Sequence, residues 1–195
     1  ELMVGGVGVL AALEWQRLIR SNGPQQRNIS WLLFGLLYIF VPCLILVWLR
    51  DIDGQGRQVV IWLFAIIWAT DIGAYFSGKS IGGPKLAPTI SPNKTWAGFF
   101  GGLFFAGLMG FILNSYVEAS FDMLEIIIAS VALSIVGQLG DLLESWVKRT
   151  FEVKDSGSLI PGHGGVLDRI DAILLAIPVA GIIVLIYDIG EVPWK

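Results

Sequence analysis

Long apolar runs separated by short polar segments dominate the chain. Four runs contain no charged residue, namely 29–49, 95–117, 126–140 and 172–187. A fifth run, 58–78, contains only Asp71, and a sixth opens the sequence at residues 2–13. Because about 20 helical residues at roughly 1.5 Å each cross a bilayer core, the pattern predicts six spanning helices. We place them near 2–18, 30–50, 58–77, 96–115, 123–144 and 170–188.

The composition agrees with this pattern. The chain is 55% hydrophobic and 15% charged, with a mean hydropathy of +0.73, which excludes an ordinary soluble domain. One cysteine, Cys43, excludes an internal disulfide and a cysteine metal cluster. We therefore predict an all-α, polytopic integral membrane helix bundle with about six transmembrane helices, and a single catalytic domain over residues 1–195. The sequence opens without Met or a basic signal region, so we expect further helices upstream in the full-length protein.

Basic residues are distributed unevenly between the two sides of this predicted bundle. Of the 13 lysines and arginines, ten fall on the alternate loops 17–29, 78–95 and 145–169, and only Arg50, Arg57 and Lys195 fall on the other side. The positive-inside rule then places the three basic loops in the cytoplasm.

The loop at 78–95 is rich in glycine and proline, which rules out a continuous helix and favours a compact, turn-rich segment. Asn93 or Thr95 can cap the helix that follows, and its free N–H groups favour an anion. Lys79, Lys85 and Lys94 add positive charge around it. The alternative for each single lysine is that it interacts with lipid headgroups at the cytoplasmic face, as basic residues near membrane helices commonly do.

Two acids, Asp71 and Asp141, lie within apolar runs. A carboxylate at membrane depth costs about 2.5–3.5 kcal/mol on insertion scales, so it normally faces a cavity, a partner or an ion. Gln138, Asp141, Ser145 and Lys148 share one broad helical face.

Asp168 and Asp171 project from one side of the last predicted helix. If that helix packs on the preceding one, Asp141, Asp168 and Asp171 can converge near the cytoplasmic boundary. Three such carboxylates need a cation between them, and oxygen ligands without cysteine favour magnesium, or manganese as a substitute. A magnesium ion held this way completes its shell with water and phosphates, which points to a nucleotide. The alternative is a buried ionic network without metal, in which Asp168 pairs with Arg169 or Lys148 and Asp141 with Arg149.

The segment 145–171 resembles the signature of the phosphatidate cytidylyltransferases, also called CDP-diacylglycerol synthases. The matching positions are Ser145, Lys148, Arg149, Lys154, Asp155, Gly157, Ile160, Pro161, His163, Gly164, Gly165, Asp168, Arg169 and Asp171. The resemblance extends to 69–71, 91–98 and 137–141, and to Glu14 and Trp15, so it covers nearly the whole chain.

The resemblance implies that CTP and phosphatidate give CDP-diacylglycerol and pyrophosphate, for phospholipid biosynthesis. It implies a helix bundle, often a homodimer, with a polar cavity open to the cytoplasm of a bacterial inner membrane. It also implies that Asp141, Asp168 and Asp171 are associated with the metal centre, with potassium as a candidate second ion beside magnesium. Membrane lipid is then a partner, and no nucleic acid is expected.

Roles for individual residues follow as hypotheses. The catalytic residues are predicted to be Asp141, Lys148, Arg149, Asp168, Arg169 and Asp171, the basic ones neutralising phosphate oxygens. The nucleotide is predicted to contact Asp71, Asn93, Lys94, Ser145, Lys154, Asp155, Gly162, His163, Gly164 and Gly165. The glycines would let backbone N–H groups approach it closely. His163, the only histidine, can stack on the base, donate to a phosphate or brace the turn.

Two other classes of function stay open on the residues alone. One is a related CTP-dependent enzyme, either a polyprenol kinase or a cytidylyltransferase for another lipid phosphate. Release of pyrophosphate distinguishes nucleotidyl transfer from a kinase, which releases CDP. The other is a transporter that uses Asp71 and Asp141 as coupling-ion sites, although the charges concentrate on one side and not at the midplane.

Overall fold

The computed structural model describes residues 1–20, 29–114, 116, 122–157, 159 and 164–187. Among them are six helices long and apolar enough to cross a membrane, which confirms the predicted all-α membrane bundle. They are α1 (Leu2–Arg20), α2 (Ile29–Arg50), α3 (Gly56–Ser80), α4 (Trp96–Leu113), α5 (Met123–Thr150) and α6 (Leu167–Ile186).

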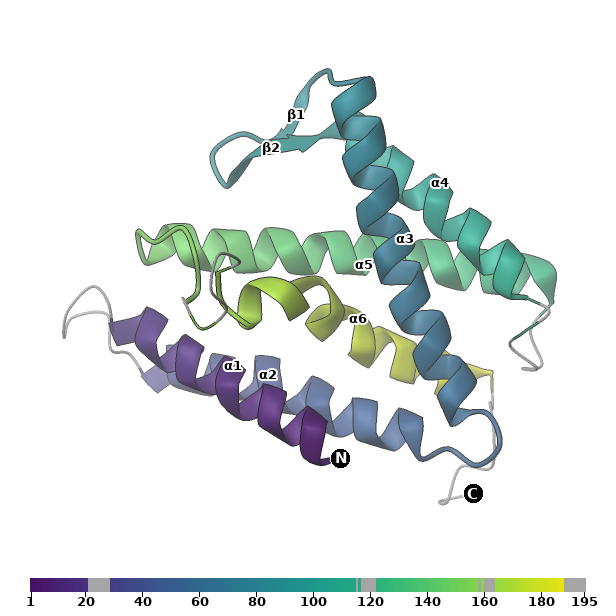
Figure 1. Cartoon of the computed structure of the whole chain (residues 1–195), viewed down its shortest axis with the longest axis horizontal. Helices are drawn as coiled ribbons and strands as arrows, with labels where there is room; N and C mark the ends of the chain where they lie inside the picture. The colour runs from purple at the N-terminus through teal and green to yellow at the C-terminus, as the bar shows by residue number, and fades with distance from the viewer. Residues whose placement is uncertain (21–28, 115, 117–121, 158, 160–163, 188–195) are drawn as a thin grey trace.

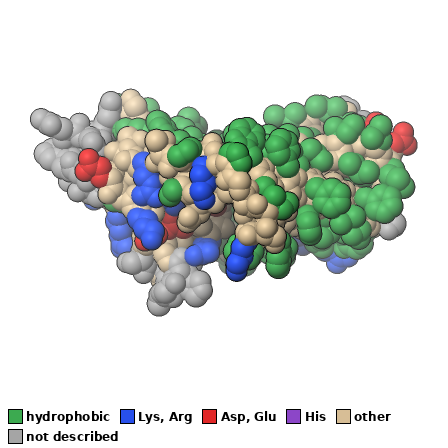
Figure 2. Space-filling view, turned by 90° about the horizontal axis from the view of Figure 1, so that it is seen from above, with side chains coloured by type: hydrophobic (Ala, Val, Ile, Leu, Met, Phe, Trp, Pro, Cys, Tyr) green, Lys and Arg blue, Asp and Glu red, His purple; other side chains and the backbone are tan. Residues whose placement is uncertain are grey.

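The helices form a layered bundle in which α5 and α6 lie in the middle, with α1 and α2 along one side and α4 on the other (Figure 1). Helix α3 crosses α5 and α6 between the α4 side and the loop that joins it to α2. Two apolar cores hold it together. One is built mainly from α3, α5 and α6 around Trp62, Leu133 and Ile177. The other joins α1, α2 and the ends of α5 and α6 around Trp15 and Phe151. Lysine and arginine side chains gather toward one end of the face seen in Figure 2, and hydrophobic side chains cover the other.

Helix α5 continues beyond the predicted end at residue 144. It begins at a capping box, in which the Asp122 N–H donates to Glu125 Oε2 at 2.9 Å, and it runs to Thr150. Ser145, Lys148 and Arg149 are therefore on its last two turns, which agrees with the predicted helical face of Gln138, Asp141, Ser145 and Lys148. The apolar run marks the membrane span and not the whole helix, whose last two turns carry charged side chains.

The segment after α3 contains the only strands among the described residues, β1 (Lys85–Ala87) and β2 (Ser91–Thr95), which pair antiparallel. Gly82 and Gly83 have φ of 67° and 92°, which ends the helical path. The hairpin refines the prediction of a turn-rich loop. Thr95 caps α4 as predicted, because its Oγ1 accepts from the Gly98 N–H at 3.1 Å.

A glycine brings α5 and α6 together where the acids lie. A Cβ at Gly140 would come within 2.7 Å of the backbone oxygen of Asp171, closer than real Cβ atoms approach. Small residues allow this kind of close approach between membrane helices. Gly140 therefore sets the spacing between its neighbour Asp141 and Asp171.

Candidate active site

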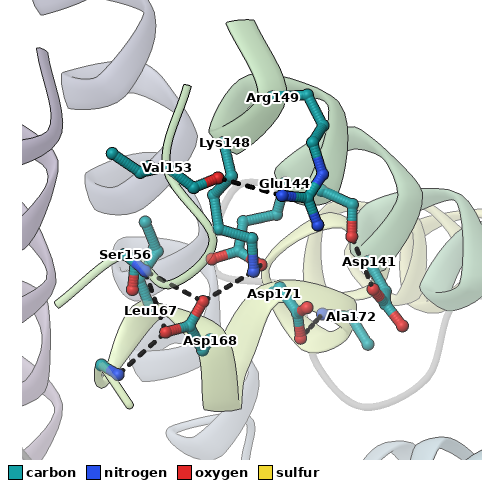
Figure 3. Close-up of polar contacts among 12 residues, drawn as sticks. Asp141, Glu144, Lys148, Arg149, Val153, Ser156, Leu167, Asp168, Asp171 and Ala172 are labelled. Atoms are coloured by element: carbon teal, nitrogen blue, oxygen red, sulfur yellow. Dashed lines mark hydrogen bonds and ion pairs between the residues drawn. The ribbon is translucent and has the colours of Figure 1, made fainter. Parts of the chain in front are cut away.

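Charged side chains from α5 and α6 form a row at the basic end of the bundle. Figure 3 shows Asp168 at one end, then Asp171, then Asp141, with Lys148 and Glu144 beside the first two. Asp171 interacts electrostatically with Asp141 and Glu144, and Asp141 also with Asp71 of α3. Helices α3, α5 and α6 thus bring together residues from three distant parts of the sequence.

Asp168 is bound by donors from three segments. Lys148 Nζ donates to Oδ1 at 2.7 Å. The Ser156 N–H lies 3.0 Å from Oδ2, and the Gly165 N–H donates to the same oxygen at 2.8 Å. Gly164 has φ of 83°, which turns the chain into this contact. Asp168 therefore ties α5 to both ends of the loop that precedes α6, and its pairing with Lys148 matches one contact of the alternative ionic network.

Glu144 is a member of the row that the sequence analysis did not single out. Its side chain is buried, with 1% of the residue exposed, and Oε2 accepts from Lys148 Nζ at 2.8 Å. Lys148 is thus shared between two carboxylates, which holds its ammonium group in place. The signal was present, since Glu144 lies three residues after Asp141 and four before Lys148 on one helical face.

A cavity of about 630 Å³ opens beside the other end of the row. Helices α3, α4 and α5 and the hairpin line it, and its polar lining includes Asp71, Lys79, Asn93, Lys94 and Asp141. Lys94 Nζ pairs with Asp141 Oδ2 at 2.5 Å across it. Its size lies within the range typical of small-molecule sites. The predicted nucleotide residues Asp71, Asn93 and Lys94 are therefore neighbours in space.

The remaining predicted residues have varied positions. Ser145 Oγ donates to Asp141 Oδ1 at 3.4 Å. Arg149 donates to the backbone oxygens of Ile90 and Val153, and so links the hairpin to the end of α5. Lys154, Asp155 and Arg169 are exposed. Gly162 and His163 lie outside the described residues.

The sequence predicted that Asp141, Asp168 and Asp171 converge on one point. In the structure they lie in a row. Within the described part of the chain, no three His, Cys, Asp or Glu side chains are grouped to hold a metal ion. The reason is that Lys148 and two backbone N–H groups hold Asp168 at the far end of the row. The neighbouring pair Asp141 and Asp171 still offers the hard oxygen ligands that suit magnesium. Metal binding stays a prediction.

Comparison with known proteins places this arrangement in a family. The cytidylyltransferase family matches residues 2–187, which includes every helix and the whole charged row. This chain belongs to the cytidylyltransferase family.

Curated members of the cytidylyltransferase family are close in sequence. A phosphatidate cytidylyltransferase of Brucella suis biovar 1 is 44% identical over 174 residues, covering 89% of this chain and 60% of that protein. Those of Rickettsia bellii and Bacillus subtilis are 39% and 40% identical, over 91% and 77% of this chain and 76% and 56% of their own lengths. The chain thus spans about 60% of the length of its Brucella suis relative.

The geometry suits the chemistry of phosphate groups. Lys94 and Lys148 place ammonium groups at opposite ends of a row of carboxylates, and the cavity lies at the Lys94 end. Ammonium groups bind phosphate oxygens as point charges, while carboxylates suit a hard divalent ion. A cytidylyltransferase needs both, because it brings two polyanions together.

Proposed function

We propose that this protein transfers CMP from CTP to phosphatidate, forming CDP-diacylglycerol and pyrophosphate for phospholipid biosynthesis. A phosphate oxygen of phosphatidate attacks the α-phosphorus of CTP, and the bond from that phosphorus to the bridging oxygen breaks as pyrophosphate leaves. The observation that carries the proposal is the family match along residues 2–187, together with the charged row and cavity inside it. The names of the curated relatives support the choice of phosphatidate.

The nucleophile needs little activation. Phosphatidate is a phosphate monoester, whose second pKa of about 6 by analogy makes it largely a dianion at neutral pH. The site must therefore position two polyanions and stabilise charge on the leaving pyrophosphate. Lys148, held by Asp168 and Glu144, and Lys94, beside Asp141, supply fixed positive charge for this task. Exposed Lys154 and Arg169 extend it toward solvent.

Asp141 and Asp171 would hold a magnesium ion, with manganese as a substitute and potassium as a possible second ion. When bound, magnesium would neutralise charge on the triphosphate. Tyr38 orients this part of the site, since its hydroxyl donates to the Asp171 backbone oxygen at 3.3 Å. Asp168 holds the Lys148 ammonium group in place at the opposite end of the row from Lys94.

We also infer the setting of the enzyme. The excess of basic residues on the segments around the site supports a position at the cytoplasmic face of a bacterial inner membrane. The resemblance to the family supports a homodimer, which crosslinking in native membranes can test.

The activity is tested with purified protein in vesicles containing phosphatidate, supplied with labelled CTP and magnesium. We expect CDP-diacylglycerol and stoichiometric pyrophosphate. Vesicles in which a polyprenol replaces phosphatidate are the matched control, and release of CDP there would instead indicate a kinase. Removal of magnesium with a chelator should stop turnover, and addition of manganese should restore part of it.

The orientation is tested with single cysteines in a Cys43→Ser background. Pro88→Cys places a thiol on the exposed turn of the hairpin, and Asp53→Cys places one on the loop between α2 and α3 at the other end. With a membrane-impermeant reagent on intact cells, or on spheroplasts where an outer membrane is present, Asp53→Cys should be labelled and Pro88→Cys only after permeabilisation. The reverse pattern would overturn the proposed topology.

A further inference from the structure

Glu14 of α1 is a buried carboxylate that the proposed chemistry does not use. Its exposed fraction is 0%, although it lies in a membrane helix where a carboxylate is costly. Oε2 accepts from the Leu167 N–H at 2.9 Å and from the Ser156 hydroxyl at 3.4 Å. Oε1 has no hydrogen-bond partner among the described residues. Ser156 lies in the loop between α5 and α6 and Leu167 is the first residue of α6, so the two donors are 142 and 153 residues from Glu14 in sequence.

The same two ends of this loop are also bound by Asp168. Ser156 donates its N–H to Asp168 and its hydroxyl to Glu14. At the other end, Gly165 donates to Asp168 and Leu167 to Glu14. The two ends of this segment, Ser156 on one and Gly165 with Leu167 on the other, are therefore held by the same two carboxylates. Movement of either end would disturb Asp168, and through it Lys148.

The loop is also shaped to fit the Glu14 side chain. A Cβ at Gly157 would lie 2.6 Å from Glu14 Oε1, and a Cβ at Gly165 would lie 2.6 Å from Oε2. Larger residues at either position would push the carboxylate away. Gly157 and Gly165 thus make room for Glu14 from both ends of the loop.

We propose that Glu14 is a positioning residue for the transfer reaction. It does not touch substrate; it fixes Ser156 and Leu167 so that Asp168 holds Lys148 toward the phosphates. The expected change in KM for CTP rests on the proposed function. The expected ordering of the loop by Glu14 does not depend on which substrate is used.

The test compares Glu14→Ala with Glu14→Gln, using Leu13→Ala, an exposed neighbour on α1, as the matched control. Gln keeps an oxygen that can accept from Ser156 and Leu167, whereas Ala keeps none. We expect Glu14→Ala to raise KM for CTP about tenfold, the low end for losing an outer partner of a site. KM for phosphatidate should stay within about twofold. Glu14→Gln should remain within about threefold of wild type for both.

A purely structural defect would lower the active fraction, and so reduce the maximal rate without changing KM for CTP. That result for Glu14→Ala, or equal damage from Glu14→Gln, would overturn the proposal. If Glu14→Ala does not fold, Gly157→Ala provides the second variant, because it displaces the carboxylate without removing it. It should also raise KM for CTP, and an unchanged KM would overturn the proposal.

Hydrogen exchange of the 164–168 segment in apo protein gives a readout independent of activity. Protection in wild type should fall in Glu14→Ala and persist in Leu13→Ala. If the wild type makes no CDP-diacylglycerol, the proposed function fails, and the exchange result still decides whether Glu14 orders the loop. Unchanged protection in Glu14→Ala would reject the positioning role.

Discussion

Asp168 and Asp141 are acids of the same row in different surroundings. Asp168 accepts from Lys148 and from two backbone N–H groups, and 11% of its side chain is exposed. Asp141 faces the cavity, pairs with Lys94 and has 37% of its side chain exposed. The sequence assigned both acids to the metal centre, but their surroundings suit two different tasks. One carboxylate builds the loop and orients a lysine, while the other is available to a ligand or ion.

Removal of Asp168 should have the largest effect on stability. In Asp168→Ala, Ser156 and Gly165 lose an acceptor and Lys148 loses one of its two carboxylates. Breaking a buried ion pair costs about 3–5 kcal/mol, and we expect a loss near the lower figure because this pair is only part-buried and Glu144 remains. Thermal unfolding in detergent measures it. Glu152→Ala, which changes an exposed acid just after the end of α5, is the control, and equal losses in the two variants would contradict the structural role of Asp168.

The second largest effect should come from Gly140, which sets the distance between the two kinds of acid. Gly140→Val would place atoms against the Asp171 backbone and force α5 and α6 apart. Overpacking of this kind costs about 1–3 kcal/mol. Activity should fall with it, because Asp141 and Asp171 separate. Gly6→Val is the matched control, since no atom lies within 4 Å of a Cβ at Gly6. A stable, active Gly140→Val protein would remove the glycine from this role.

The sequence predicted the six helices because membrane spans follow from apolar length alone. It also predicted one of two residues, Asn93 or Thr95, as the cap of α4, and the joining of α5 and α6 near Asp141 and Asp171. The apolar run ends near residue 144, whereas the shared helical face of Asp141, Ser145 and Lys148 predicted that the helix continues, as it does to Thr150. The position of Asp168 could not be read from spacing, since it depends on backbone N–H groups of Ser156 and Gly165 that only the folded loop presents.

Substitution of Asp141 should have the smallest effect on stability, and it tests the contrast between Asp141 and Asp168 most directly. Asp141→Asn keeps the shape of the side chain and an oxygen for Ser145, but removes the charge. Because partly exposed ion pairs contribute about 0–1 kcal/mol, unfolding should change by no more than that. Turnover should nevertheless fall about 100-fold or more, the scale expected when an electrostatic contact to the transition state is lost. Thermal unfolding and CDP-diacylglycerol formation are measured on the same preparation.

Lys94→Met separates the two explanations that remain for a low turnover in Asp141→Asn. If Asp141 serves mainly to hold Lys94, the double variant should be no worse than either single variant, because both remove one contact. If Asp141 acts on a ligand or ion directly, the losses should be close to multiplicative. A stability loss in Asp141→Asn as large as that of Asp168→Ala would instead place both acids in the same structural role, and the distinction between loop-building and cavity-facing carboxylates would fail.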